Sequence, residues 1–156
     1  MRFKESDVRA MGRTACGVRG VRLGKDQRVI SLIIGNEGDV MTVTENGFGK
    51  RTPIEQFPVK GRGGMGVISI KTSDRNGKQI GAVRVSGDDE MMLITDGGTL
   101  VRTRVADVSQ MGRDTQGVTM IRLSKGEKLI GIERVEALDD GSGDEVDDDG
   151  LGDAVD

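Results

Sequence analysis

Hydrophobic and polar residues alternate in short runs along this chain, which is the pattern of half-buried β-strands. Two pairs of runs are joined by Asn-Gly or Asp-Gly turns, which predict hairpins at residues 40–54 and 91–105. Such turns need positive φ, and we expect Gly47 and Gly98 to supply it. The alternating runs are residues 17–23, 29–34, 40–44, 49–54, 66–70, 80–85, 91–95, 100–105, 117–123 and 129–135.

The runs recur with the period of a structural repeat. A shift of 100 residues places Asp7-Val8 on Asp107-Val108, and a shift of about 50 also brings related residues into register. Four short strands in ~50 residues are typical of a propeller blade. No window has a convincing helical period over ten residues. The predicted fold class is therefore all-β, a partial propeller-like array of four-stranded blades with about three blades.

The repeat pattern also divides the chain. Residues 1–138 form the partial array, followed by an acidic tail at 139–156 whose Gly, Asp and Ser we expect to stay disordered. Within the array we expect the end of a preceding repeat, two complete repeats and the opening of a last one. These segments are residues 1–11, 12–60, 61–111 and 112–138.

The composition excludes several kinds of chemistry. The chain has three Phe but no Trp, Tyr or His, so it offers no imidazole base and no histidine zinc site. The single cysteine, Cys16, cannot form an internal disulfide, which agrees with a reducing cytoplasm. No apolar run is long enough to span a membrane. We expect no metal site, no cofactor and no catalytic residue.

Charge is distributed unevenly between the two parts. The segment 139–156 holds nine of the 26 acidic residues and no basic one, so residues 1–138 have 17 acidic against all 23 basic residues. A basic body with an acidic tail is typical of a polyanion-binding protein that carries its own competitor. The alternative is a tail that only adds solubility.

Arginine and lysine recur at fixed positions of the repeat, in the fourth strand and at the opening turn. Because residues two apart on a strand face the same side, Arg102 and Arg104 should project together. A basic belt around the blades would suit the phosphate backbone of DNA. The alternative is that these residues protect exposed edge strands. The candidate DNA-binding residues are Arg2, Lys4, Arg13, Lys50, Arg51, Lys60, Arg62, Arg102, Arg104 and Arg113.

Repeats with a Gly-Val-x-x-Ile opening, a Thr-x-Asn/Asp-Gly hairpin and an Arg-Thr fourth strand resemble the C-terminal domain of DNA gyrase A. Residues 2–12 and 94–104 look especially similar to it, and the resemblance covers residues 1–138. Residues 60–66 resemble a degenerate copy of the family's Gln-Arg-Arg-Gly-Gly-Lys-Gly box. The resemblance implies a β-pinwheel whose basic outer rim wraps duplex DNA.

The resemblance further implies a role in ATP-dependent negative supercoiling. The expected partners are double-stranded DNA, the rest of gyrase A and gyrase B, in the bacterial cytoplasm. ATP and Mg²⁺ would be used by those other parts, which would also supply the tyrosine nucleophile that this chain lacks. The alternatives are the equivalent module of topoisomerase IV and a propeller-like scaffold for protein interactions.

Overall fold

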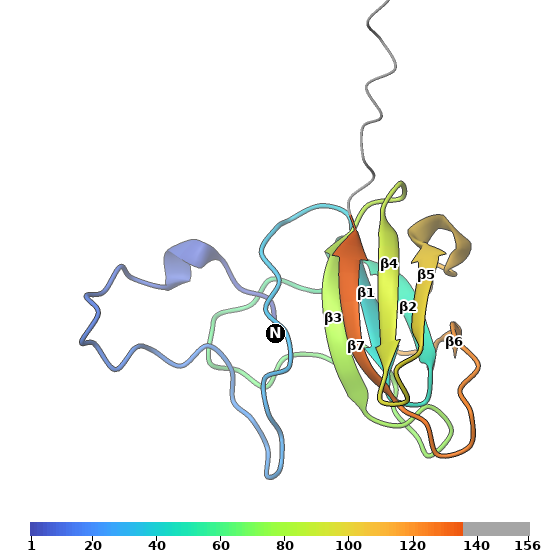
Figure 1. The fold of residues 1–156 in the computed structure, drawn as a ribbon. Helices are drawn as coiled ribbons and strands as arrows, with labels where there is room; N and C mark the ends of the chain where they lie inside the picture. The colour runs from blue at the N-terminus through green and yellow to red at the C-terminus, as the bar shows by residue number, and fades with distance from the viewer. Residues whose placement is uncertain (136–156) are drawn as a thin grey trace, which may run out of the picture.

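The computed structural model describes residues 1–135 (Figure 1). The acidic tail predicted at 139–156, and residues 136–138 of the last repeat, lie outside the described residues. Three short 3₁₀ turns, which the sequence patterns did not predict, are the only helical elements of the described part, and none could cross a membrane. The 3₁₀ turns are η1 (Glu5–Asp7), η2 (Ile54–Gln56) and η3 (Val105–Asp107).

The rest of the regular structure is β-strand, which confirms the all-β prediction. The strands form two antiparallel sheets with the orders β3-β1-β2-β6 and β5-β4-β7. Both expected hairpins are present, as β1–β2 and β4–β5. The strands are β1 (Asp39–Thr44), β2 (Phe48–Pro53), β3 (Gln79–Val85), β4 (Glu90–Thr95), β5 (Leu100–Arg104), β6 (Val118–Thr119) and β7 (Leu129–Val135).

Each sheet is assembled from more than one sequence repeat. The β1–β2 hairpin comes from the first repeat, β3 from the second and β6 from the third. In the same way the β4–β5 hairpin of the second repeat pairs with β7 of the third. A repeat therefore donates its early strands to hairpins that precede it in the chain, so blade and repeat do not coincide.

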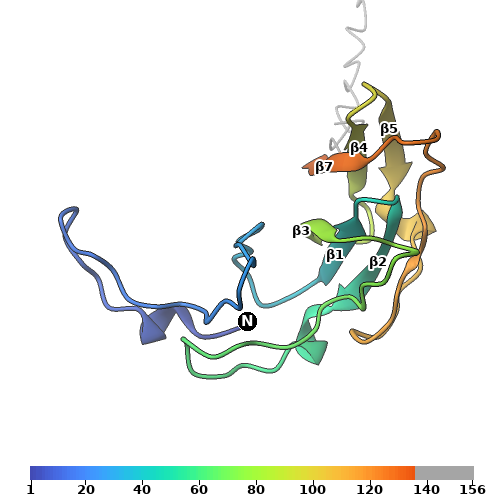
Figure 2. The ribbon, with the colours of Figure 1, turned by 90° about the horizontal axis from the view of Figure 1, so that it is seen from below.

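This exchange explains why the predicted strands 17–23 and 29–34 of the first repeat are not present. Residues 17–23, 29–34 and 66–70 have no strand assignment, and only Val118–Thr119 of the run 117–123 forms a ladder. The early runs of the first repeat have no preceding hairpin within residues 1–135 to join. Figures 1 and 2 show this N-terminal part as loops that extend away from the two sheets. Alternation predicts a half-buried strand, but a strand also needs a partner for its backbone hydrogen bonds.

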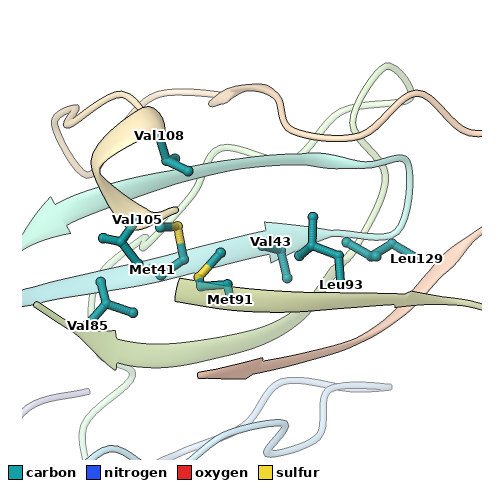
Figure 3. Close-up of a cluster of buried hydrophobic side chains, with 8 residues drawn as sticks. All are labelled: Met41, Val43, Val85, Met91, Leu93, Val105, Val108 and Leu129. Atoms are coloured by element: carbon teal, nitrogen blue, oxygen red, sulfur yellow. The ribbon is translucent and has the colours of Figure 1, made fainter. Parts of the chain in front are cut away.

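The hydrophobic core lies between the two sheets (Figure 3). Met41 and Val43 of β1 face Met91 and Leu93 of β4, and all four are fully buried. None of the three Phe side chains belongs to this core cluster. Its other members are Val85, Val105, Val108 and Leu129.

Two glycines have the predicted conformation. Gly47 has φ +79° and Gly98 has φ +84°, which confirms that both hairpin turns use the left-handed region. The third repeat packs directly on the first of these turns, since the amides of Met120 and Ile121 donate to the Gly47 carbonyl at 2.9 and 3.3 Å. The turn at Gly98 has no equivalent neighbour within the described residues.

Candidate nucleic-acid interface

The first group of predicted DNA-binding residues, the fourth-strand arginines, makes contacts between repeats. Arg2 Nη1 donates to the carbonyls of Ile54 and Phe57, at 2.8 and 3.1 Å. Arg51 Nε donates to the carbonyl of Val108 at 2.8 Å, and its Nη1 lies 3.5 Å from Asp39. Both arginines therefore bind the 3₁₀ turn region of the following repeat. We call this contact the arginine clasp of Arg2 and Arg51.

Arg102 and Arg104 are the other fourth-strand arginines, and both are exposed on β5, as expected for residues two apart. Arg102 pairs with Glu90 on the neighbouring strand. Arg104 pairs with Asp107, with Nε–Oδ2 and Nη2–Oδ1 distances of 3.0 and 3.1 Å, and this carboxylate raises the pKa of Arg104. Such exposed pairs contribute little to stability. Both guanidinium groups remain accessible to an anion.

The opening-turn arginines also contact a neighbouring repeat. Arg62 donates to the carbonyls of Asp7 and Arg19, at 3.0 and 3.1 Å. Arg113 donates to the carbonyl of Ile68 at 2.8 Å. Arg13 is exposed and has no side-chain partner within residues 1–135. A guanidinium has five N–H donors, so Arg62 and Arg113 retain donors beyond these bonds.

Lys50 is placed in the interior, which corrects its assignment to the basic rim. It is fully buried, and its Nζ donates to the carbonyls of Gly112 and Arg113, each at 2.5 Å. Burial lowers the pKa of Lys50 to about 8, against the opposing effect of Asp114. The side chain is held inside because two carbonyls of the third repeat satisfy its donors. Lys50 thus holds the turn that carries Arg113.

The two remaining predicted residues, Lys4 and Lys60, are exposed, and their side chains have no partner within the described part of the chain. The Lys60 amide donates to the Arg2 carbonyl at 3.0 Å, so the backbone at Lys60 belongs to the contact between repeats. The nearby glycine-rich loop serves the same contact, since the Gly63 amide donates to the Gly20 carbonyl at 2.7 Å. This loop therefore joins repeats.

One repeated basic position was missed by the sequence patterns considered above. Arg22, Lys71 and Arg122 occupy the same place in the three opening runs, with spacings of 49 and 51 residues. All three are exposed, and none has a side-chain partner within residues 1–135. We call these three residues the opening-strand series. A search of the sequence for basic residues spaced by 49 and then 51 residues would have found this series.

Backbone contacts confirm that the first two of these positions, Arg22 and Lys71, are equivalent. The amides of Arg22 and Lys71 donate to the carbonyls of Gly64 and Thr115, both at 2.8 Å, which is the same contact one repeat later.

A capped turn follows each of the three positions. The cap is a side-chain oxygen that accepts the amide three residues before it, at 2.7, 2.7 and 2.9 Å. The capping residues are Gln27, Asn76 and Glu127. The opening-strand series therefore repeats in the structure as well as in the sequence.

Comparison with known proteins identifies the family. The family model described as the DNA gyrase C-terminal domain, beta-propeller, matches residues 1–36, 38–86 and 89–136. The chain belongs to this gyrase C-terminal domain family. The resemblance inferred from the sequence motifs is thereby confirmed.

Curated relatives of this gyrase domain agree. The chain is 56% identical over 142 residues to the DNA gyrase A of Salmonella typhimurium, a match that covers 90% of this chain. It is 54% identical over 147 residues to the Pseudomonas aeruginosa protein of the same name, covering 94% of this chain. For the Escherichia coli protein the identity is 53% over 136 residues, covering 86%. The chain spans 16% of the length of each of these relatives.

Solved structures support the same fold. A structure of the DNA gyrase A C-terminal domain matches with a TM-score of 0.77 and 28% identity, covering 85% of this chain and 45% of that one. The C-terminal domain of DNA topoisomerase IV matches with a TM-score of 0.78 and 25% identity, covering 86% and 42%. The two folds are equally similar. The 53–56% identity to gyrase A proteins therefore favours gyrase over topoisomerase IV.

Proposed function

We propose that this chain binds duplex DNA without sequence preference, as the DNA-binding and DNA-wrapping module of a gyrase A protein. The observation that carries the proposal is the opening-strand series, which places one exposed, unpaired basic side chain on each repeat. Regularly spaced cations suit a phosphate backbone, which presents charge at regular intervals and carries no base information. Membership of the gyrase C-terminal domain family supports duplex DNA as the polyanion.

The charge of the described residues favours the same partner. Ten of the 26 acidic residues follow Val135, which leaves 16 acidic residues against 23 basic ones in residues 1–135. The clasp arginines and Lys50 use donors for carbonyls of other repeats, so we assign them to holding the blades together. Arg13, Lys4, Lys60, Arg102 and Arg104 are exposed and would add phosphate contacts to those of the opening-strand series.

Within a topoisomerase this module would act by presenting wrapped DNA to other parts of the enzyme. Its partners would be the rest of gyrase A and gyrase B, in a bacterial cytoplasm. ATP and Mg²⁺ would be bound by those parts, and so would the DNA strands during cleavage. The chain itself has no Tyr and no His, so we assign it no catalytic step.

Binding to two duplexes of unrelated sequence tests this function. Fluorescence anisotropy with 40-base-pair DNA should give equal affinities for both sequences, falling steeply between 50 and 200 mM KCl because phosphate contacts release counterions. A scaffold for protein interactions would bind neither duplex at 50 mM salt. Binding that does not change with salt, or that differs tenfold between the sequences, would contradict a backbone-directed mode.

A further inference from the structure

Two arginines occupy equivalent positions near the ends of β3 and β7. Arg84 and Arg134 are 50 residues apart in the sequence. In their ladders they lie opposite Val40 of β1 and Met91 of β4, which are themselves 51 residues apart. β3 and β7 lie side by side (Figure 1), and Figure 2 shows both strands on the concave side of the curved chain. Consecutive repeats thus bring two equivalent arginines to one cavity.

Arg134 has a carboxylate partner that Arg84 lacks. Nη1 of Arg134 lies 3.3 Å from Oδ2 of Asp89, and Asp89 is buried. The position equivalent to Asp89 in the preceding repeat, 51 residues earlier, is Gly38. Arg84 therefore has no equivalent carboxylate beside it, and its guanidinium has no hydrogen-bond or ion-pair partner within residues 1–135.

Backbone contacts show that Gly38 and Asp89 are equivalent. The Gly38 carbonyl accepts from the Ile54 amide at 3.1 Å, and the Asp89 carbonyl accepts from the Val105 amide at 2.9 Å. Position 38 cannot itself supply the missing carboxylate. Its φ is +84°, and a Cβ there would lie 2.8 Å from the Val85 carbonyl oxygen.

The guanidinium of Arg84 lies at a cavity of about 300 Å³. Its stem is fixed there because it packs on Gly35, where an added Cβ would lie 2.9 Å from Arg84 Cδ. The side chain is half-buried, so salt screens its attraction for an anion less than at an exposed arginine. A cavity of this size accommodates a small molecule. The lining residues are Glu37, Gly38, Arg84, Val85, Ser86 and Arg134.

We propose that Arg84 and this cavity bind the carboxylate of a small organic acid, which takes the place that Asp89 fills beside Arg134. The planar guanidinium presents two parallel N–H donors that match the two oxygens of a carboxylate. The Ser86 hydroxyl, on the cavity wall, provides a further donor. Glu37 lines the same cavity and repels added negative charge, so the site should prefer a monoanion to a dianion.

Nuclear magnetic resonance of the ¹⁵N-labelled full chain tests this site, with acetate as the probe and chloride at equal ionic strength as the reference. Acetate should shift the Nε–Hε signal of Arg84 saturably, with a dissociation constant of about 10 mM or lower. Sulfate, a dianion, should bind more weakly. Arg84→Gln should weaken acetate binding about tenfold or more. Arg84→Lys keeps the charge and most of the stem, and should still weaken binding because the two parallel donors are lost.

The matched control is Arg28→Gln, at an exposed arginine whose side chain also has no partner within residues 1–135, and it should leave acetate binding unchanged. Equal effects of the Arg28 and Arg84 variants, or a chloride shift equal to that of acetate, would reduce the effect to general electrostatics and overturn the proposal. Sulfate binding as tight as that of acetate would overturn the carboxylate assignment. Saturable binding that occurs only in Glu37→Gln would show that Glu37 already occupies Arg84, which also contradicts the proposal.

Discussion

The packing of the third repeat on the first can be tested with a matched pair of glycines. Gly47 and Gly98 lie in the turns of equivalent hairpins and have nearly equal φ, +79° and +84°. A Cβ added at Gly98 meets nothing within 4 Å, whereas at Gly47 it would lie 2.5 Å from the Ile121 carbonyl oxygen. The two sites therefore differ in their neighbours and share their backbone strain.

The expected cost follows from these contacts. Alanine in the left-handed region costs about 1–2 kcal/mol, which is the whole effect expected for Gly98→Ala. At Gly47 the carbonyl cannot move aside, because the amide of the same residue, Ile121, is bonded to Gly47. Overpacking of this kind adds about 1–3 kcal/mol. Gly47→Ala should therefore destabilise the chain by about 2–5 kcal/mol.

Urea unfolding, followed by circular dichroism, measures both free energies of unfolding. Gly87→Ala is the control, because a Cβ there meets nothing and no positive φ is involved, so its stability should stay within about 1 kcal/mol of wild type. Equal destabilisation by Gly47→Ala and Gly98→Ala would refute the reasoning. It would mean that the third repeat does not pack on the β1–β2 turn.

Three further outcomes are expected. Lys50 has a pKa of about 8 in the folded chain, against the ordinary value of 10.5 that applies to the unfolded chain. Between these pH values the unfolded chain therefore binds more protons than the folded chain. The free energy of unfolding of the wild type, measured with urea and compared with that of Lys50→Met, should therefore rise between pH 8 and pH 10.5. A difference between the two proteins that stays constant over this range would contradict the lowered pKa of Lys50. Replacing Arg102 and Arg104 together by Ala should reduce the salt slope of DNA binding by up to about two contacts, with no change in sequence preference, in anisotropy titrations. Truncation after Leu138 should strengthen DNA binding at low salt but not at high salt in the same titrations. The reason is that the nine carboxylates of residues 139–156 compete with DNA phosphates for the basic side chains, and salt screens this competition. An unchanged affinity at low salt would show that the tail does not compete.

The sequence predicted local structure well and partners poorly. Hairpins β1–β2 and β4–β5 could be predicted because strand alternation and the Gly47 and Gly98 turns are local signals. The pairing of β3 with β1, across repeats, could not, since alternation says that a strand is half-buried without saying against which strand. Residues 29–34 illustrate this: the pattern is that of a strand, but in the described chain these residues form no ladder, and Ser31 contacts β3 through its side chain, whose Oγ accepts from the Ala82 amide at 2.9 Å.

The basic residues show the same limit. The repeat spacing correctly indicated that arginines occupy equivalent positions, and Arg2 and Arg51 do make equivalent contacts. Those contacts reach backbone carbonyls near 3₁₀ turns, which the alternation pattern did not predict. Lys50 is among the predicted DNA-binding residues, but its side chain lies in the contact between repeats. Whether a cation is free for DNA depends on such long-range packing.

The most direct test of the proposed DNA-binding surface compares two triple variants. The first replaces Arg22, Lys71 and Arg122 by Gln, and the second makes the same change of charge at three exposed, non-equivalent positions. The control positions are Arg9, Arg28 and Lys125.

The plot of log affinity for a 40-base-pair duplex against log salt concentration is the measurement. Each phosphate contact contributes about 0.9 to its slope, so loss of the opening-strand series should reduce the slope by about 2.7 and the control by clearly less. Equal reductions would show that only net charge matters, and an unchanged slope for the first variant would place the DNA elsewhere on the molecule.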